Sequence, residues 1–217
     1  MVRRAIRWIL VCGVLAALLF TLAGTWRDPW LWGYLAVIAL IGALAMTTID
    51  DDLARERYRP PSPGADRLSL RTIRQIAVLH LVVGVLDGAR FHWTVVPAWL
   101  RAVGLAGFGL SFLLVFRAMA VNRFFSAVVR VQSERGHRVV DNGPYAVVRH
   151  PGYAGMIPAV PFSGLALGSW IGVAVALVYS ALILNRVRFE DRFLRASLEG
   201  YRAYASRVRY RLVPGVW

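Results

Sequence analysis

Residues 152–185, GYAGMIPAVPFSGLALGSWIGVAVALVYSALILN, form an unbroken stretch without a charged side chain. A helix needs about 17 to 25 mostly apolar residues to cross a bilayer, so the stretch is long enough for two helices. Gly168 and Ser169, near its middle, favour a turn. Pro158 and Pro161 predict that the first helix is bent or incomplete. The stretch therefore predicts a helical hairpin in a membrane.

Four further apolar stretches precede the hairpin, at residues 5–26, 30–49, 75–96 and 98–121. The first also fits a signal peptide, with small residues near a cleavage point, but its length and the spans that follow favour a membrane helix. Hydrophobic residues make up 58% of the 217 residues and charged residues only 18%, against about 25% charged in soluble domains. We therefore expect an all-α, polytopic integral membrane protein with about six transmembrane helices and no soluble domain.

The charges predict the orientation of these helices. The formal net charge is +14, and all basic residues are arginine. Six spans place 23 arginines on one side and only Arg27, Arg90 and Arg101 on the other. Because cytoplasmic loops are enriched in basic residues, we expect a multi-pass membrane protein with both termini in the cytoplasm. The basic charge is suited to lipid headgroups, so no nucleic-acid partner is needed.

Cys12 is the only cysteine in the sequence, so no disulfide and no metal site are expected.

Three polar regions belong to the predicted cytoplasmic side. Residues 50–74 are polar and interrupted by prolines, which predicts a mobile connector within the N-terminal region 1–120. Residues 121–157 contain GPY at 143–145 and RHPGY at 149–153. These turn-forming residues bring backbone groups, a histidine and a tyrosine together where the chain re-enters the membrane. From the residues alone, an amphipathic surface segment with snorkelling arginines is favoured over a functional site for this region.

The third region, 185–217, predicts an amphipathic cytoplasmic helix, because apolar residues recur at spacings of three and four. These residues are Leu194, Leu198, Tyr201, Tyr204, Val208 and Leu212. Arg186 and Glu190 are four residues apart and share a helix face, either as a structural ion pair or as a charged pair at a ligand site. His80 and Asp87 also share a face, and a helix–helix hydrogen bond is favoured over a polar relay.

Residues 121–217 resemble the bacterial branch of the isoprenylcysteine carboxyl methyltransferase family and, more distantly, the membrane phospholipid N-methyltransferases. The resemblance rests on NRFFSAVVRVQSERGHRVVDNGPYAVVRHPGYAG, then LGSW, then EDRFL and GYRAYASRVRYRLVPGVW. It implies that 121–217 is the catalytic region of an integral membrane methyltransferase that uses S-adenosylmethionine and releases S-adenosylhomocysteine. The family usually has two glutamates where this chain has Glu190-Asp191.

Matching positions imply the residues that bind the cofactor and the methyl acceptor. Arg186 would face the acceptor, and Arg186 and Glu190 would be the catalytic pair. The cofactor would contact Gln132, His137, Arg138, Val139, Val140, Tyr145, His150, Pro151, Gly152, Tyr153 and Glu190. Aromatic faces and a carboxylate suit a cationic sulfonium. The acceptor would be a small lipophilic molecule from the bilayer, with a carboxylate favoured over a lipid amine, phenol or thiol. A sterol-type NADPH-dependent membrane reductase and a non-catalytic membrane subunit are the alternatives.

Overall fold

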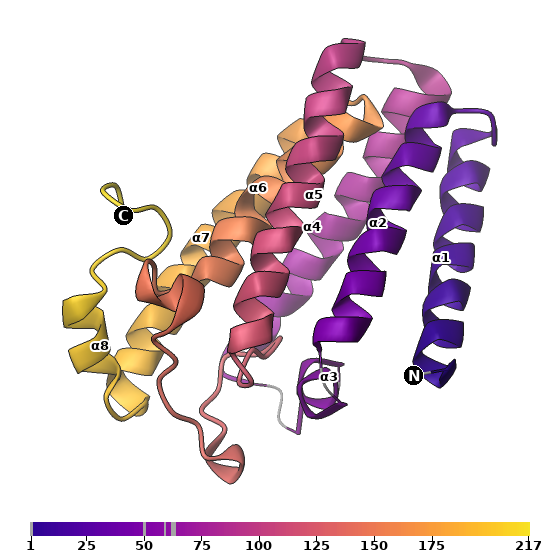
Figure 1. Cartoon of the computed structure of the whole chain (residues 1–217). Helices are drawn as coiled ribbons and strands as arrows, with labels where there is room; N and C mark the ends of the chain where they lie inside the picture. The colour runs from indigo at the N-terminus through magenta and orange to yellow at the C-terminus, as the bar shows by residue number, and fades with distance from the viewer. Residues whose placement is uncertain (1, 50, 59, 62–63) are drawn as a thin grey trace.

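The computed structural model describes residues 2–49, 51–58, 60–61 and 64–217, and these residues contain helices but no strand (Figure 1). Within them, the long helices are α1 (Val2–Ala23), α2 (Pro29–Thr48), α4 (Arg67–Val85), α5 (Ala98–Val121), α6 (Pro151–Leu167) and α7 (Trp170–Ser197). The shorter elements are α3 (Asp51–Tyr58), α8 (Tyr201–Arg207), a π-helical turn after α4 (Leu86–Phe91) and two 3₁₀ turns (Ser133–Arg135 and Gly143–Ala146). The prediction of an all-α fold is confirmed.

Five helices of the described chain are long and apolar enough to cross a membrane: α1, α2, α4 with its π-helical extension, α5 and α7. Helix α6 has 17 residues and runs through both internal prolines without a break. Its length of about 25 Å falls short of a hydrocarbon thickness of about 30 Å. Large apolar side chains such as Ile9 and Leu40 are about 70% exposed, as expected for surfaces that face lipid. The chain is therefore a multi-pass membrane protein.

The hairpin of α6 and α7 is closed by the two residues that predicted its turn. Gly168 ends α6 in the left-handed conformation, with φ of 84°, which glycine adopts without steric cost. Ser169 then caps α7, because its hydroxyl accepts a hydrogen bond of 2.7 Å from the backbone N–H of Gly172. The predicted turn and the start of the hairpin are confirmed, but α7 continues past the predicted end at residue 185 to Ser197.

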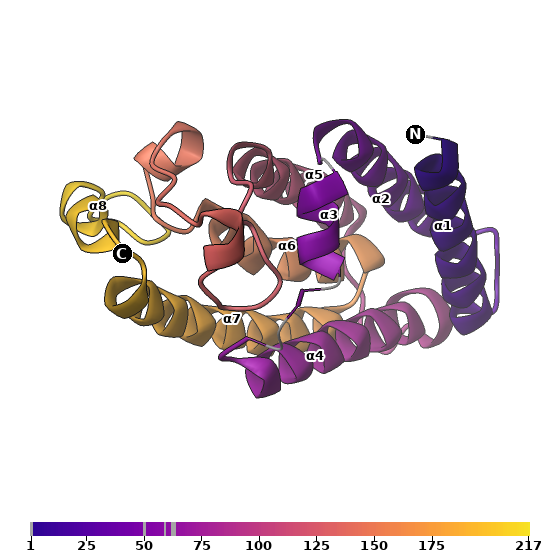
Figure 2. The same cartoon turned by 90° about the horizontal axis from the view of Figure 1, so that it is seen from below.

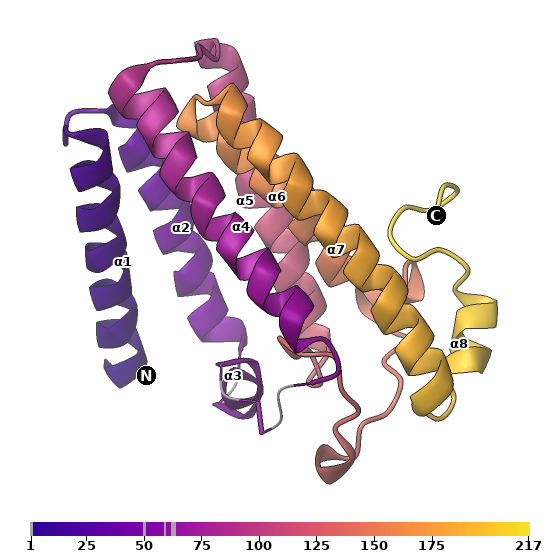
Figure 3. The same ribbon diagram turned by 180° about the vertical axis from the view of Figure 1, so that it is seen from behind.

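Helix α6 lies in the middle of the bundle, between α5 and α7 (Figure 2). Small residues allow α5 and α6 to approach closely: a Cβ added at Gly155 would lie 2.5 Å from the carbonyl oxygen of Ser111. Helices α4 and α7 run side by side on the opposite face (Figure 3). Helix α1 lies at the edge of the bundle, where it packs against α2 and α4.

Buried polar groups join these helices through hydrogen bonds. His80 Nδ1 lies 2.9 Å from the carbonyl oxygen of Gly172, and its Nε2 lies 3.0 Å from the hydroxyl of Ser163. Asp87 Oδ2 instead accepts hydrogen bonds of 2.5 Å from the hydroxyl groups of Thr94 and Ser169. The two side chains therefore have separate partners, which agrees with the favoured interpretation as structural hydrogen bonds.

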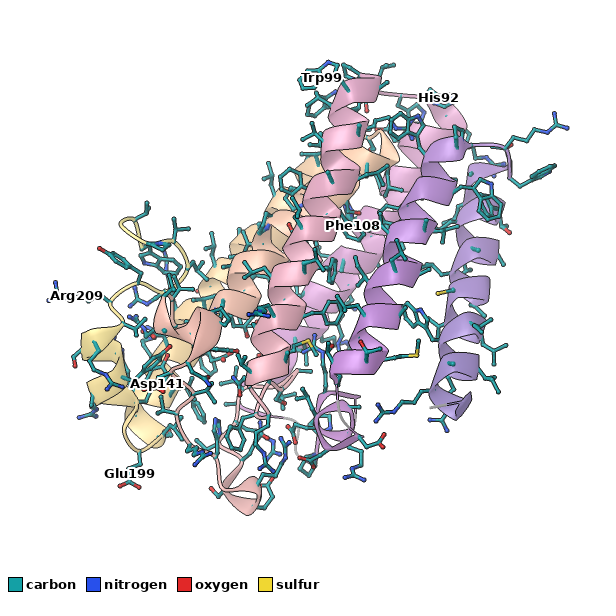
Figure 4. The ribbon with its side chains drawn as sticks, in the orientation of Figure 1. His92, Trp99, Phe108, Asp141, Glu199 and Arg209 are labelled. Carbon is teal, nitrogen blue, oxygen red and sulfur yellow. The ribbon has the colours of Figure 1, made fainter. Side chains whose placement is uncertain are left out.

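The two ends of the bundle differ in character (Figure 4). His92 and Trp99 lie at one end, and Asp141, Glu199 and Arg209 lie at the other. Arg90 contacts the carbonyl oxygens at the end of α1, and Arg101 contacts those at the end of α6. The arginines assigned to the far side by sequence therefore gather at the His92 end. Helix α3, residues 122–150 and α8 lie at the opposite end, which we call the α3/α8 end.

The interpretation of residues 50–74 as a connector is wrong for its described part; residues 50, 59 and 62–63 lie outside that part. The stretch contains α3 and the first turns of α4. Glu56 on α3 is 4% exposed and accepts hydrogen bonds from Arg130 Nε at 3.0 Å and Ser126 Oγ at 2.7 Å. The charges of this stretch are therefore used in long-range ion pairs, which the local pattern does not reveal.

The prediction of one amphipathic helix over residues 185–217 is also wrong. Helix α7 ends at Ser197, and Gly200 adopts the left-handed conformation before α8 begins. After α8 the chain turns back, and the carbonyl oxygens of Tyr210 and Arg211 accept hydrogen bonds of 2.9 Å from the backbone N–H groups of Arg149 and His150. The predicted apolar face nevertheless becomes a buried cluster around Leu198, Tyr201, Tyr204 and Ala205.

Candidate active site

A cavity of about 390 Å³ opens at the α3/α8 end of the bundle. Its wall brings together the start of α4, residues 122–150, the start of α6, the second half of α7, and α8. Ten of the residues singled out from the sequence line it: His137, Arg138, Val139, Val140, Tyr145, His150, Gly152, Tyr153, Arg186 and Glu190. A neighbouring cavity of about 460 Å³ shares the wall formed by Phe124 and residues 138–140.

Gln132 and Pro151 lie beside the cavity and not on its wall. Gln132 is 1% exposed, and its side-chain amide donates a hydrogen bond of 2.7 Å to the carbonyl oxygen of Phe124. Its backbone N–H donates to Nδ1 of His137 at 3.2 Å. Pro151 is fully buried at the first position of α6. Both residues therefore support neighbours that do line the cavity.

Tyr153 connects Arg186 and Glu190 at the centre of the site. The phenol oxygen of Tyr153 accepts a hydrogen bond of 2.9 Å from Arg186 Nε and donates one of 2.6 Å to Glu190 Oε2. Arg186 and Glu190 both belong to the described part of the chain, and they form no direct ion pair with each other. Arg186 pairs with Asp66. The simple i,i+4 ion pair considered from the sequence is therefore replaced by a tyrosine bridge.

Glu190 and its neighbour Asp191 have opposite surroundings. Glu190 faces the cavity and, within the described chain, no arginine or histidine lies within ion-pair distance of it. Asp191 is 0% exposed and contacts Arg149 Nε at 2.7 Å, Arg211 Nε at 3.1 Å and Tyr201 Oη at 3.1 Å. Glu190 is therefore available to a cation in the cavity, whereas Asp191 holds together the elements around it.

Asp191 also positions His150. The ring nitrogen Nε2 of His150 lies 3.4 Å from Asp191 Oδ1 and 3.4 Å from the hydroxyl of Tyr201. Arg149 reaches further and donates to the carbonyl oxygens of Val208 and Arg209 at 2.8 and 2.7 Å. The RHPGY segment is thus fixed to α7, α8 and the chain that follows α8.

His137 is neutral in this site. Burial, with the nearby positive charges of Arg130 and Arg135, lowers the pKa of His137 to about 4. Nδ1 accepts the hydrogen bond from Gln132, so the proton is on Nε2. The ring stacks on Phe124, with 4.5 Å between the centroids. His137 therefore presents one N–H donor and an aromatic face.

Buried tyrosines form the opposite wall. Burial raises the pKa of Tyr145, Tyr201 and Tyr204 above the ordinary value for a phenol, so all three remain uncharged. The hydroxyl of Tyr204 donates a hydrogen bond of 2.8 Å to the carbonyl oxygen of Tyr145. The hydroxyl of Tyr145 accepts one of 3.0 Å from the amide of Asn122. The wall is therefore rigid and aromatic.

Sequence reasoning missed three residues that the structure places at the site. Asp66 forms an ion pair of 3.0 Å with Arg186. Glu56 forms an ion pair with Arg130, and the ring of Phe124 stacks on that of His137. Asp66 precedes an apolar helix, where an aspartate is expected as a cap, but it makes no cap hydrogen bond. The sequence therefore favours a capping role for Asp66 and gives no signal of its pairing with Arg186.

A model of the isoprenylcysteine carboxyl methyltransferase family matches residues 103–196, which include Tyr153, Arg186 and Glu190. This match, with the relatives below, supports the resemblance of the chain to that family. The family is one of membrane methyltransferases, and that class of enzyme is what the comparisons support for this chain. These findings support the family predicted from the motifs.

Two curated relatives illustrate the likeness. Protein-S-isoprenylcysteine O-methyltransferase B of Arabidopsis thaliana is 27% identical over 138 residues, which are 61% of this chain and 68% of that protein. The cobalt-zinc-cadmium resistance protein CzcN of Cupriavidus metallidurans is 28% identical over 140 residues, which are 62% of this chain and 59% of that protein. The aligned regions thus cover 68% of the first relative and 59% of the second.

A solved structure shares the fold. The eukaryotic intramembrane Ras methyltransferase of this family matches with a TM-score of 0.62 and 20% identity, covering 96% of this chain and 76% of that chain. At this identity the match establishes the helical architecture alone. It extends beyond residues 103–196 to nearly all of the chain, including the four N-terminal spans.

Proposed function

We propose that this chain transfers a methyl group from S-adenosylmethionine to a small lipophilic acceptor, with a carboxylate as the favoured acceptor group. The observation that carries the proposal is Glu190. In a chain with 26 arginines, this carboxylate faces a cavity without an arginine partner in the described residues and is held by Tyr153. Glu190 is half-buried, and a partly desolvated carboxylate is stabilised by a positive partner. A cationic cofactor supplies one.

The residues of the cavity fit S-adenosylmethionine. The cofactor carries a sulfonium and an ammonium group, both of which are stabilised by carboxylates and aromatic faces. Glu190 provides the carboxylate, and Tyr145, Tyr153 and Tyr201 provide aromatic surface around it. His137 offers its Nε2–H and the face of its ring. A Cβ on Gly152 would lie 2.4 Å from the ring of Phe125, so a side chain there would disturb this wall.

Bound S-adenosylmethionine supplies an activated methyl group for an in-line displacement, and the residues of this chain align the acceptor and exclude water. Arg186 is suited to the acceptor, because it lines the cavity and Nη1 makes no hydrogen bond within the described residues. A carboxylate is already ionised at neutral pH, so it needs no general base. The N–H groups of Nη1 of Arg186 would donate to it and orient it.

The acceptor would reach Arg186 from the lipid. The cavity wall includes Leu70, Ile73 and Ala77 of α4, and Tyr179 and Ile183 of α7, which are membrane helices. Arg74 lies on the same part of the wall and is exposed. Such a wall suits a molecule with an apolar tail and an anionic head. Lipid amines, phenols and thiols are the other acceptor classes that this apolar wall admits.

The proposed orientation follows from the same arrangement. The α3/α8 end carries the cavity and most of the arginines. We place this end, with both termini, in the cytoplasm of a bacterial cell, where S-adenosylmethionine is made.

Incubation of membranes that contain the protein with methyl-labelled S-adenosylmethionine tests the proposal. A labelled lipophilic product is expected, and mild alkali should release its label as methanol if the acceptor is a carboxylate. Label that resists alkali would point to an amine, a phenol or a thiol, and absence of a labelled product would overturn the proposal. Arg186→Ala should raise the acceptor KM or lower kcat while leaving the affinity for S-adenosylhomocysteine within about twofold.

A further inference from the structure

Asp66 lies on a segment that docks against the catalytic region from outside it. The backbone N–H of Ala65 donates to the carbonyl oxygen of Val129 at 2.9 Å, and Asp66 Oδ1 accepts from the N–H of Val129 at 3.1 Å. Gly64 has φ of 72°, and a Cβ there would lie 2.6 Å from Val128 Cβ. Only glycine permits this approach, so the position of Asp66 is built into the fold.

The second oxygen of Asp66 is directed at Arg186. Asp66 is 7% exposed, and Oδ2 lies 3.0 Å from Arg186 Nη2 but accepts no hydrogen bond among the described residues. Arg186 is also buried, at 5% exposed, and its Nη2 donates to the carbonyl oxygen of Ala127 at 2.6 Å. The two side chains form a buried ion pair, and removal of one partner leaves the other charge uncompensated.

Arg186 has a competing anion on its own helix. Glu190 is one turn further along α7, and both residues already bond to the hydroxyl of Tyr153, at 2.9 and 2.6 Å. Arginine and glutamate at this spacing readily pair. A direct pair would neutralise the carboxylate that the cofactor needs and would withdraw Arg186 from the acceptor.

We propose that Asp66 is a positioning residue that holds Arg186 away from Glu190, so that Glu190 remains free for the cofactor and Arg186 for the acceptor. The inference rests on the proposed function. It assigns a role in the reaction to a residue outside the family-matched region 103–196.

The test is the affinity for S-adenosylhomocysteine in detergent, measured by titration calorimetry on the wild type, Asp66→Asn, Arg186→Ala and the double variant. In Asp66→Asn, Arg186 should pair with Glu190, and Glu190 would lose its charge-assisted hydrogen bond to the ligand. The loss of one such bond should weaken binding about tenfold or more. Adding Arg186→Ala should restore the affinity, because the competing guanidinium is gone. A residue with a purely structural role shows no such restoration.

The matched control is Glu56→Gln, which removes another buried carboxylate that clamps the same loop without contacting Arg186. Arg186→Ala should not restore any affinity that Glu56→Gln has lost.

Unchanged binding by Asp66→Asn, or a double variant that remains weak, overturns the inference alone. A wild type that does not bind S-adenosylhomocysteine overturns the proposed function with it. If Asp66→Asn does not purify, the double variant must match Arg186→Ala in affinity; weaker binding overturns the inference.

Discussion

Asp191→Asn should destabilise the protein strongly, although the substitution is nearly isosteric. Asp191 is the buried anion at which Arg149, Arg195, Arg211 and His150 meet. The side chain of Arg149 is only 2% exposed, so loss of the carboxylate leaves its charge buried and unpaired. Breaking a buried pair in this way costs about 3–5 kcal/mol.

The thermal unfolding midpoint in detergent, followed by tryptophan fluorescence, measures this cost. In a protein of this size 1 kcal/mol corresponds to about 2–4 °C, so a decrease of roughly 6–20 °C is expected. Asp141→Asn is the matched control, because its pair with Arg207 is exposed, at 52% and 67%. Such a pair is worth less than about 1 kcal/mol.

A midpoint for Asp191→Asn within 2 °C of the wild type would refute the interpretation of Asp191 as the structural centre of the site. An equal decrease for Asp141→Asn would show that any loss of negative charge destabilises so basic a protein.

Three further predictions test the fold and its charges. Because His137 has a pKa of about 4 when folded and about 6.5 when unfolded, the unfolded chain binds the extra proton between these values. The free energy of unfolding should therefore fall as the pH drops from 6.5 to 4, and His137→Gln should flatten this slope in thermal melts. Gly155→Ala should cost about 1–3 kcal/mol through its clash with the backbone of Ser111, whereas Gly13→Ala, with open space around it, should leave the midpoint unchanged. Reporter fusions at residues 60, 130 and 217 should lie in the cytoplasm and those at 28 and 97 on the far side, and a far-side result at 217 would mean that α6 or α7 does not span.

The fold was largely predictable because membrane spans are encoded locally. Runs without charge define the helices, and Gly168-Ser169 defines the turn between two of them. The two errors, at 50–74 and 185–217, both concern polar segments. There the pattern of charges is the same for a solvated loop and for a loop whose charges are paired across the molecule.

The candidate site was predictable where its residues share one short segment, as Tyr153 and His150 do. It was not predictable where contacts join distant parts of the chain. Asp66 meets a residue more than a hundred positions away, and Tyr153 separates Arg186 from Glu190 although their spacing suggests a direct pair. Such contacts depend on how the helices pack, which periodicity does not specify.

Binding of S-adenosylhomocysteine to the purified protein tests the central claim most directly. We predict that it raises the unfolding midpoint of the wild type, that NADPH does not, and that Glu190→Gln abolishes most of the shift. Glu199→Gln, the same change at an exposed residue of the same end, should respond as the wild type does. S-adenosylhomocysteine lacks the sulfonium but keeps the ammonium group of the methyl donor. No shift with the wild type, or an equal shift with Glu190→Gln, would contradict the claim that Glu190 binds this ammonium group.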